Sequence, residues 1–61
     1  MSDRLPERIH LVGIGGIGLS AIARVLAMRG HRVSGSDMRN SPITDELERE
    51  GISVSIGHSA D

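Results

Sequence analysis

Residues 13–18 of this 61-residue chain read Gly-Ile-Gly-Gly-Ile-Gly and follow a short apolar run at residues 9–12. A long apolar segment, residues 19–28, comes directly after them. Glycines at positions 13, 15 and 18 fit the pattern G-x-G-x-x-G, which is informative when a strand precedes it and a helix follows. The flanking sequence predicts that setting. The motif therefore constrains the chain to a strand, a tight turn and a helix that begins at the turn.

The remaining sequence predicts the order β-α-β-α-β. Strands are expected at about residues 8–12, 32–36 and 52–56, and helices at about residues 17–29 and 42–50. Gly30 and Gly51 are expected to end the helices, while Ser41 and Pro42 are expected to begin the second one. Strands that alternate with helices form right-handed crossovers and a parallel sheet. The predicted fold class is α/β, a three-layer Rossmann-like parallel sheet that is partial, because these elements make about half of a doubly wound domain.

The chain is short for an independent domain. A chain of 61 residues buries only about 60 % of its unfolded surface and lies near the limit of independent stability. Its first predicted helix is apolar around most of its circumference, which predicts burial on more than one side. We therefore expect residues 1–61 to be the N-terminal part of a larger domain, and we expect the isolated chain to be marginally stable or to self-associate.

Composition excludes several classes of function. The net charge is −1 and there is no Phe, Tyr or Trp, so neither nucleic acid nor an anionic membrane is favoured as a partner. The longest apolar stretch, residues 19–28, is too short to span a bilayer, and the polar N-terminus does not resemble a signal peptide. The absence of cysteine fits a cytoplasmic protein. The three histidines are far apart and lack the spacing of metal ligands.

Each glycine of the motif has an expected role. Gly13 permits the tight turn after the first strand, Gly15 leaves room for a phosphate near the backbone, and Gly18 lets the helix pack close to the strand. Gly16 is an additional glycine that widens the concavity. The N–H groups of residues 15–18, together with the helix dipole, then favour an anion. The motif predicts a binding site for a diphosphate.

Other residues are candidates for the same site. Asp37 lies 19 positions past Gly18, near the spacing of about 20 for an acid that binds ribose hydroxyls. Ser20, one turn inside the helix, is expected to add a hydroxyl group. His58 follows the third predicted strand, at the carboxyl edge where ligands bind open parallel sheets. The structural alternatives are that Asp37 caps the next turn and that His58 is a solvated loop residue.

Catalytic groups are not evident in the sequence. None of the candidate residues looks like a nucleophile with its base or like a pair of catalytic carboxylates. The chain also lacks a G-x-x-x-x-G-K-[ST] sequence for the phosphates of ATP. We therefore expect no catalytic, cofactor-binding or metal-binding residues within it. On spacing alone, the glycine motif fits an NAD(P)-binding half-domain of an oxidoreductase, or a non-catalytic module that senses nucleotides.

Three blocks of sequence narrow this interpretation. Residues 9–20 closely resemble the start of the Mur ligases that add L-alanine to UDP-N-acetylmuramate, the first amino-acid-adding enzymes of peptidoglycan synthesis. Residues 33–37 (Val-Ser-Gly-Ser-Asp) and residues 56–58 (Ile-Gly-His) resemble the same family, in the same order. The doubled glycine followed by Gly-Leu-Ser at residues 18–20 is more specific than the dinucleotide pattern.

This resemblance implies a cytoplasmic, ATP-dependent ligase that uses magnesium and joins L-alanine to UDP-N-acetylmuramate. It implies that the N-terminal domain is Rossmann-like and binds the UDP part of this substrate, while ATP and L-alanine bind other domains. The chain would then be a substrate-binding fragment that is inactive alone. The residues that the resemblance places around UDP are Gly13, Gly15, Gly16, Ile17, Gly18, Ser20, Ser36, Asp37 and His58.

Overall fold

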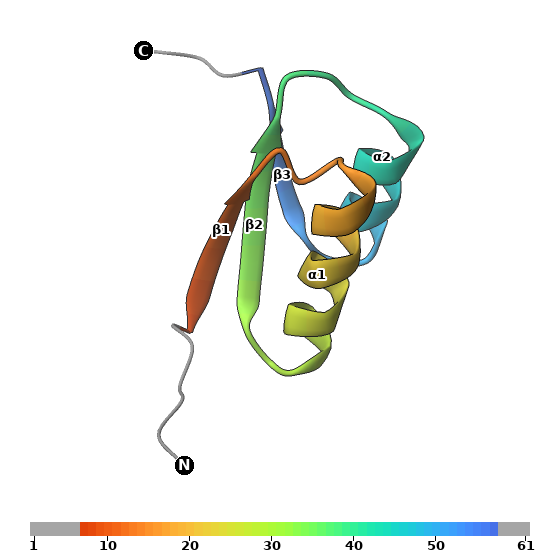
Figure 1. The fold of residues 1–61 in the computed structure, drawn as a ribbon. Helices are drawn as coiled ribbons and strands as arrows, with labels where there is room; N and C mark the ends of the chain where they lie inside the picture. The colour runs from red at the N-terminus through yellow and green to blue at the C-terminus, as the bar shows by residue number, and fades with distance from the viewer. Residues whose placement is uncertain (1–6, 58–61) are drawn as a thin grey trace.

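The computed structural model describes residues 7–57, which form three strands and two helices (Figure 1). The elements are β1 (Arg8–Val12), α1 (Ile17–Met28), β2 (Arg32–Asp37), α2 (Pro42–Arg49) and β3 (Ser53–Ile56). The sheet order is β1-β2-β3, and both strand pairs are parallel. This arrangement confirms the predicted α/β class and the β-α-β-α-β order. The predicted bounds of β1 are also correct, and those of the other elements differ by one residue.

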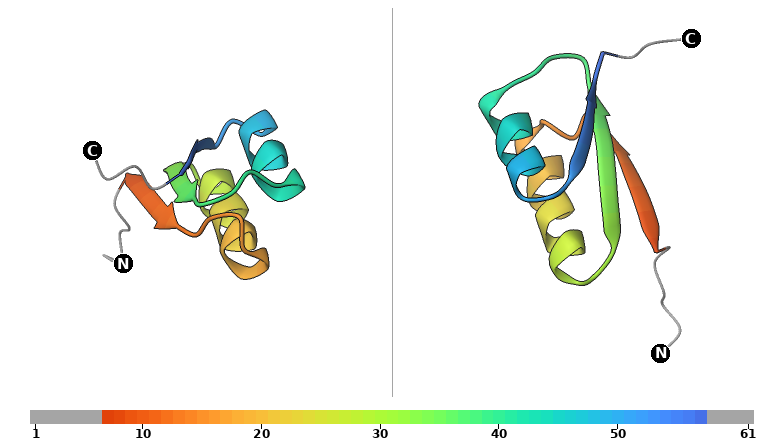
Figure 2. Two further views of the ribbon diagram at one scale, coloured as in Figure 1. Left: turned by 90° about the horizontal axis from the view of Figure 1, so that it is seen from above. Right: turned by 180° about the vertical axis from the view of Figure 1, so that it is seen from behind.

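Both helices cover the same face of the sheet (Figures 1 and 2). Two right-handed crossovers that proceed in one direction along a sheet place their helices on one side. In β2, Val33 and Gly35 are buried beneath the helices, while Arg32, Ser34 and Ser36 alternate with them and lie on the opposite face. Residues 7–57 thus supply two layers of the three-layer fold, one of strands and one of helices.

The core lies between the sheet and the two helices. Its buried apolar side chains come from both helices, from β2 and from two connecting segments: Ile14, Ala23, Val33, Leu47 and Ile52. Ile14 is fully buried although it lies between two glycines of the motif. The turn that begins the candidate site is therefore anchored in the core by its own side chain.

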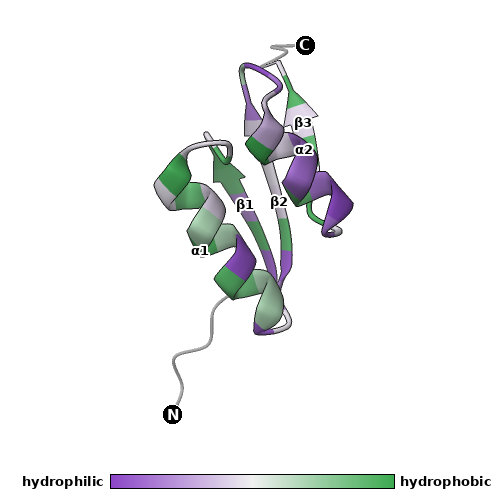
Figure 3. Cartoon of the chain, turned by 90° about the vertical axis from the view of Figure 1, so that its right-hand side faces the viewer, coloured by the Kyte–Doolittle hydropathy of each residue, from purple (hydrophilic) through white to green (hydrophobic). Residues whose placement is uncertain are grey.

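The outer face of α1 carries exposed apolar residues, and much of the α1 ribbon is green in Figure 3. Ser20 and Ala23 are buried, whereas Ile22 and Val25 are about half exposed, and Met28 is 85 % exposed. Burial of α1 on more than one side, which its sequence predicts, is therefore not provided by residues 7–57. No helix in this part of the chain is long and apolar enough to cross a membrane.

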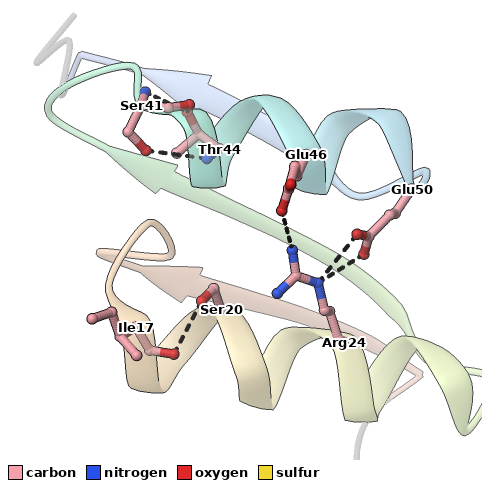
Figure 4. Close-up of polar contacts among 7 residues, drawn as sticks. All are labelled: Ile17, Ser20, Arg24, Ser41, Thr44, Glu46 and Glu50. Carbon is pink, nitrogen blue, oxygen red and sulfur yellow. Dashed lines mark hydrogen bonds and ion pairs between the residues drawn. The ribbon is translucent and has the colours of Figure 1, made fainter.

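Arg24 connects the two helices through ion pairs (Figure 4). Its Nη2 donates to Glu46 Oε1 at 3.1 Å, and its Nε donates to the Glu50 carboxylate at 2.9 and 3.2 Å. The hydrogen bond to Glu50, with the charges of both acids, raises the pKa of Arg24 above its ordinary value. Arg24 is therefore charged at every physiological pH. Because the three side chains are partly exposed, water and salt weaken the attraction.

α2 begins with a capping box (Figure 4). The Ser41 hydroxyl accepts from the Thr44 amide at 3.1 Å, and the Thr44 hydroxyl accepts from the Ser41 amide at 2.8 Å. Pro42 occupies the start of the helix, where its fixed φ is favourable and its missing N–H has no cost. The predicted start of the second helix is confirmed.

Removing this cap is expected to open the start of α2. Loss of an N-cap side chain costs about 0.5–2 kcal/mol, so Ser41→Ala should speed hydrogen exchange of the Thr44 amide about fivefold. The control is Ser55→Ala, which removes the same hydroxyl from an exposed position of β3. An equal change of Thr44 exchange in both variants would contradict the capping role.

Candidate anion-binding site

The glycine loop, defined here as residues 13–16, leaves β1 at the carboxyl edge of the sheet. Gly13 has a φ of +81°, a conformation that side chains other than glycine rarely adopt. The Ser36 carbonyl accepts from the amides of Gly13 and Ile14 at 2.8 and 3.1 Å, and the Gly13 carbonyl accepts from Gly16 at 3.0 Å. The expected tight turn at Gly13 is confirmed, and its backbone is tied to the end of β2.

Asp37 holds the loop at a second point. Its Oδ2 accepts from the Gly15 amide at 2.7 Å, and its Oδ1 accepts from the Met38 amide at 2.8 Å. A Cβ on Gly15 would lie 2.7 Å from Asp37 Oδ2 and 3.0 Å from Thr44 Cγ2. The structure therefore gives a packing reason for glycine at this position, because Asp37 and Thr44 occupy the space that a Cβ would need.

α1 begins without a side-chain cap. Gly16 is its N-cap residue, and its first turn carries no acidic side chain. The first amide to bond within the helix is that of Ser20, which donates to the Gly16 carbonyl at 2.8 Å. Among residues 7–57, no group accepts from the amides of Ile17, Gly18 and Leu19. Three amides without an acceptor in the described part of the chain, at the positive end of a helix dipole, favour an anion.

Gly18 and Ser20 have surroundings other than those expected. Apart from its chain neighbours and the backbone of its own helix, a Cβ on Gly18 would meet no atom within 4 Å, so the prediction that Gly18 permits close packing against the strand is wrong. Ser20 is only 3 % exposed, and its hydroxyl donates to the Ile17 carbonyl at 3.0 Å (Figure 4). The Ser20 hydroxyl therefore donates its hydrogen bond within α1.

The ends of β2 and β3 complete the same edge of the sheet. Ser36 contributes its carbonyl to the loop, and Asp37 contributes its carboxylate, as described above. The Gly57 amide donates to the Asp37 carbonyl at 2.8 Å, which places the start of the next loop beside Asp37. His58, the remaining predicted site residue, lies outside the described residues.

Sequence reasoning missed the roles of Ile14 and Thr44. Ile14 packs against Gly35, where an added Cβ would overlap the Ile14 side chain and lie 2.7 Å from the Leu11 carbonyl oxygen. This contact leaves no room for a side chain at Gly35. Thr44 is 1 % exposed and lies behind Gly15. The sequence signal for Ile14 was an apolar residue between two glycines. The signal for Thr44 was the Ser-x-x-Thr spacing of the cap.

The site offers backbone donors rather than reactive side chains. Among residues 7–57, no group of three or more His, Cys, Asp or Glu side chains could hold a metal ion. The donors that remain, at the start of α1, suit recognition of a negatively charged group. This arrangement can bind and orient a ligand.

Comparison with known proteins identifies close relatives. Residues 8–61 match the family described as "Mur ligase family, catalytic domain". A UDP-N-acetylmuramate–L-alanine ligase of Campylobacter jejuni is 56 % identical over 55 residues, covering 90 % of this chain and 13 % of the relative. The enzyme of the same name from Pelobacter propionicus is 60 % identical over 55 residues, covering 90 % of this chain and 12 % of the relative.

A solved structure agrees with this relationship. The crystal structure of UDP-N-acetylmuramate–alanine ligase from Thermotoga maritima superposes with a TM-score of 0.83 at 44 % identity. The alignment covers 88 % of this chain and 13 % of that one. This chain thus spans about one eighth of the length of these relatives, and over that length it belongs to the Mur ligase family.

Proposed function

We propose that this chain is the N-terminal, UDP-binding part of an ATP-dependent ligase that joins L-alanine to UDP-N-acetylmuramate. The observation that carries the proposal is the uncapped start of α1 beside the glycine loop, in a family whose relatives are named for this reaction. The activity belongs to the complete protein. The chain alone is expected to be inactive, because it contains no candidate for a catalytic residue.

In this proposal the diphosphate of UDP binds the amides of Ile17, Gly18 and Leu19. Charge at an exposed helix N-terminus is stabilised by about 0.3–1 kcal/mol, and each hydrogen bond to a charged group adds about 1.5–3 kcal/mol. Association itself costs about 4–15 kcal/mol. The amides alone therefore bind a nucleotide weakly, and most of the affinity comes from further contacts, including parts of the protein outside this chain.

The nucleoside end of the ligand is proposed to lie toward the ends of β2 and β3. Ser36 and Asp37 end β2 next to the glycine loop, on the edge where open parallel sheets bind ligands. His58 follows Gly57, whose amide contacts the Asp37 carbonyl. The side chains of Ser36 and His58 are the proposed direct contacts with ribose and uracil, and Asp37 lines the same pocket.

ATP, magnesium and L-alanine are proposed to bind elsewhere in the complete protein. The sequence G-x-x-x-x-G-K-[ST] forms a loop that holds the phosphates of ATP in many nucleotide-binding proteins. The 61 residues do not contain it. Among residues 7–57, no group of three or more His, Cys, Asp or Glu side chains could hold a metal ion. The proposed ATP and magnesium sites therefore lie in other parts of the complete protein. We propose that the complete protein is cytoplasmic. We also propose that the isolated chain self-associates through the apolar face of α1.

Calorimetric titration of the complete protein with UDP-N-acetylmuramate and with NADH tests the proposal. We expect saturable binding of the UDP-sugar, competition by UDP, and no binding of NADH. The relatives reported above are ligases, which favours this outcome over an NAD(P)-dependent oxidoreductase. Binding of NADH without a response to the UDP-sugar would overturn the proposal.

A further inference from the structure

The Asp37 carboxylate links two segments that are distant in the sequence. Its two oxygens each accept one backbone amide, from Gly15 in the glycine loop and from Met38 after β2. A carboxylate accepts at both oxygens and donates at neither, and hydrogen bonds to an ionised acceptor are about twice as strong as neutral ones. Asp37 therefore fixes the glycine loop relative to the end of β2.

Thr44 closes the space on the other side of Gly15. Its Cγ2 would lie 3.0 Å from a Cβ at Gly15, and its hydroxyl is hydrogen-bonded to Asn40 Oδ1 and to the Ser41 amide, both at 2.8 Å. Because Thr44 is buried at the start of α2, it has little freedom to move away. Gly15 is therefore held between a carboxylate and a methyl group.

We propose that Asp37 is a positioning residue that fixes the glycine loop and thereby holds the start of α1 where it binds an anion. In the bound state the Gly15 amide stays on Asp37, and the diphosphate takes the amides of Ile17, Gly18 and Leu19. A single N–H has one proton, so the Gly15 amide cannot serve the carboxylate and a phosphate equally well. The inference rests on the proposed function and divides the backbone donors of the site into structural and ligand-binding groups.

Asp37→Asn separates this role from a general effect of charge. An asparagine side chain has one acceptor oxygen, one donor NH₂ group and no charge, so it releases one of the two amides that Asp37 now holds and binds the other only through a weaker, neutral hydrogen bond. Asp45→Asn is the matched control, since it makes the same chemical change at an exposed position in the first turn of α2. Only the first variant should loosen the loop.

The first measurement needs no ligand. Hydrogen exchange of the Gly15 amide in the complete protein should speed by about 10–150-fold in Asp37→Asn, the loss expected for a hydrogen bond to a charged group, and should not change in Asp45→Asn. Unchanged Gly15 exchange in Asp37→Asn would overturn the inference. This result would stand even if the UDP-sugar proved not to bind.

The second measurement uses UDP-N-acetylmuramate. In the unmodified protein the UDP-sugar should protect the amides of residues 17–19 and leave the slow exchange of Gly15 as it was. Asp37→Asn should raise KM for the UDP-sugar about tenfold without changing KM for ATP, a split that general unfolding would not produce. Faster Gly15 exchange on ligand binding would overturn the inference, because Asp37 would then have left the loop for the ligand.

Gly15→Ala reaches the same contact from the other side. Its Cβ would displace the carboxylate while Asp37 keeps its charge, so Gly15→Ala should also raise KM for the UDP-sugar. The double variant should lose no more than the larger single effect, because both changes break one interaction. Additive losses would count against the contact. Failure of the UDP-sugar to bind the unmodified protein would instead overturn the proposed function.

Discussion

Gly35→Val is expected to destabilise the protein by about 3 kcal/mol, at the upper end of the usual cost of overpacking a core. A Cβ at this position would overlap the buried Ile14 side chain and approach the Leu11 carbonyl oxygen to 2.7 Å. Neither neighbour can move easily, because Ile14 is fully buried and Leu11 is the register partner of Gly35 in the β1–β2 ladder. Thermal or denaturant unfolding of the complete protein measures the effect.

The control for this substitution is Ser55→Val. It adds a side chain of the same shape to an exposed position of β3, where a β-branched residue is well tolerated. We expect little change in the unfolding midpoint for this variant. Equal shifts in the two variants would show that Gly35 is not required by its contact with Ile14.

Ile17→Pro is expected to weaken UDP-sugar binding by about 10–150-fold, the equivalent of one hydrogen bond to a charged group. Proline at the first helical position removes an N–H and leaves the helix intact. Gly16 already has φ −69° and ψ 152°, a conformation that residues before proline favour. The Ile17 side chain is 83 % exposed, so its loss should cost little packing energy.

Ile17→Ala is the matched control because it removes most of the side chain and keeps the amide. Titration with UDP-N-acetylmuramate should show near-normal affinity for Ile17→Ala and weak affinity for Ile17→Pro, with the KM for ATP unchanged in both. If alanine and proline have the same effect, the Ile17 amide does not hold the ligand.

The order of strands and helices could be predicted because its signals are local. Gly30 and Gly51 have φ values of +94° and +95°, which is why glycine follows each helix. Ser41 and Pro42 start α2 through contacts within one helical turn. Gly13 requires its positive φ for the turn after β1. None of these features depends on which segments meet in the folded chain.

The internal contacts of the site could not be predicted in the same way. The hydrogen bond from Gly15 to Asp37 joins residues 22 positions apart, and it exists only because β1 and β2 are neighbours. The Asp37 spacing matched an acid that binds ribose, but spacing alone does not show which donor the carboxylate accepts. The expected role of Gly18 was also wrong, since only the folded chain shows that a Cβ at this position would have room.

The apolar outer face of α1 illustrates a further limit. Its sequence predicts burial on more than one side, and the sheet and α2 provide burial on only part of its surface. What covers Ile22, Val25 and Met28 depends on atoms beyond residues 7–57. The apolar pattern therefore predicted the helix correctly, but it did not predict which segments bury each side of that helix.

UDP binding at the start of α1 is tested most directly by a crystal structure of the complete protein with UDP-N-acetylmuramate. We expect diphosphate oxygens at about 2.7–3.2 Å from the backbone nitrogens of Ile17, Gly18 and Leu19, the range of an N–H···O hydrogen bond. Asp37 Oδ2 should remain on the Gly15 amide. A UDP-sugar bound elsewhere, with the first amides of α1 left to water, would contradict the assignment of this site.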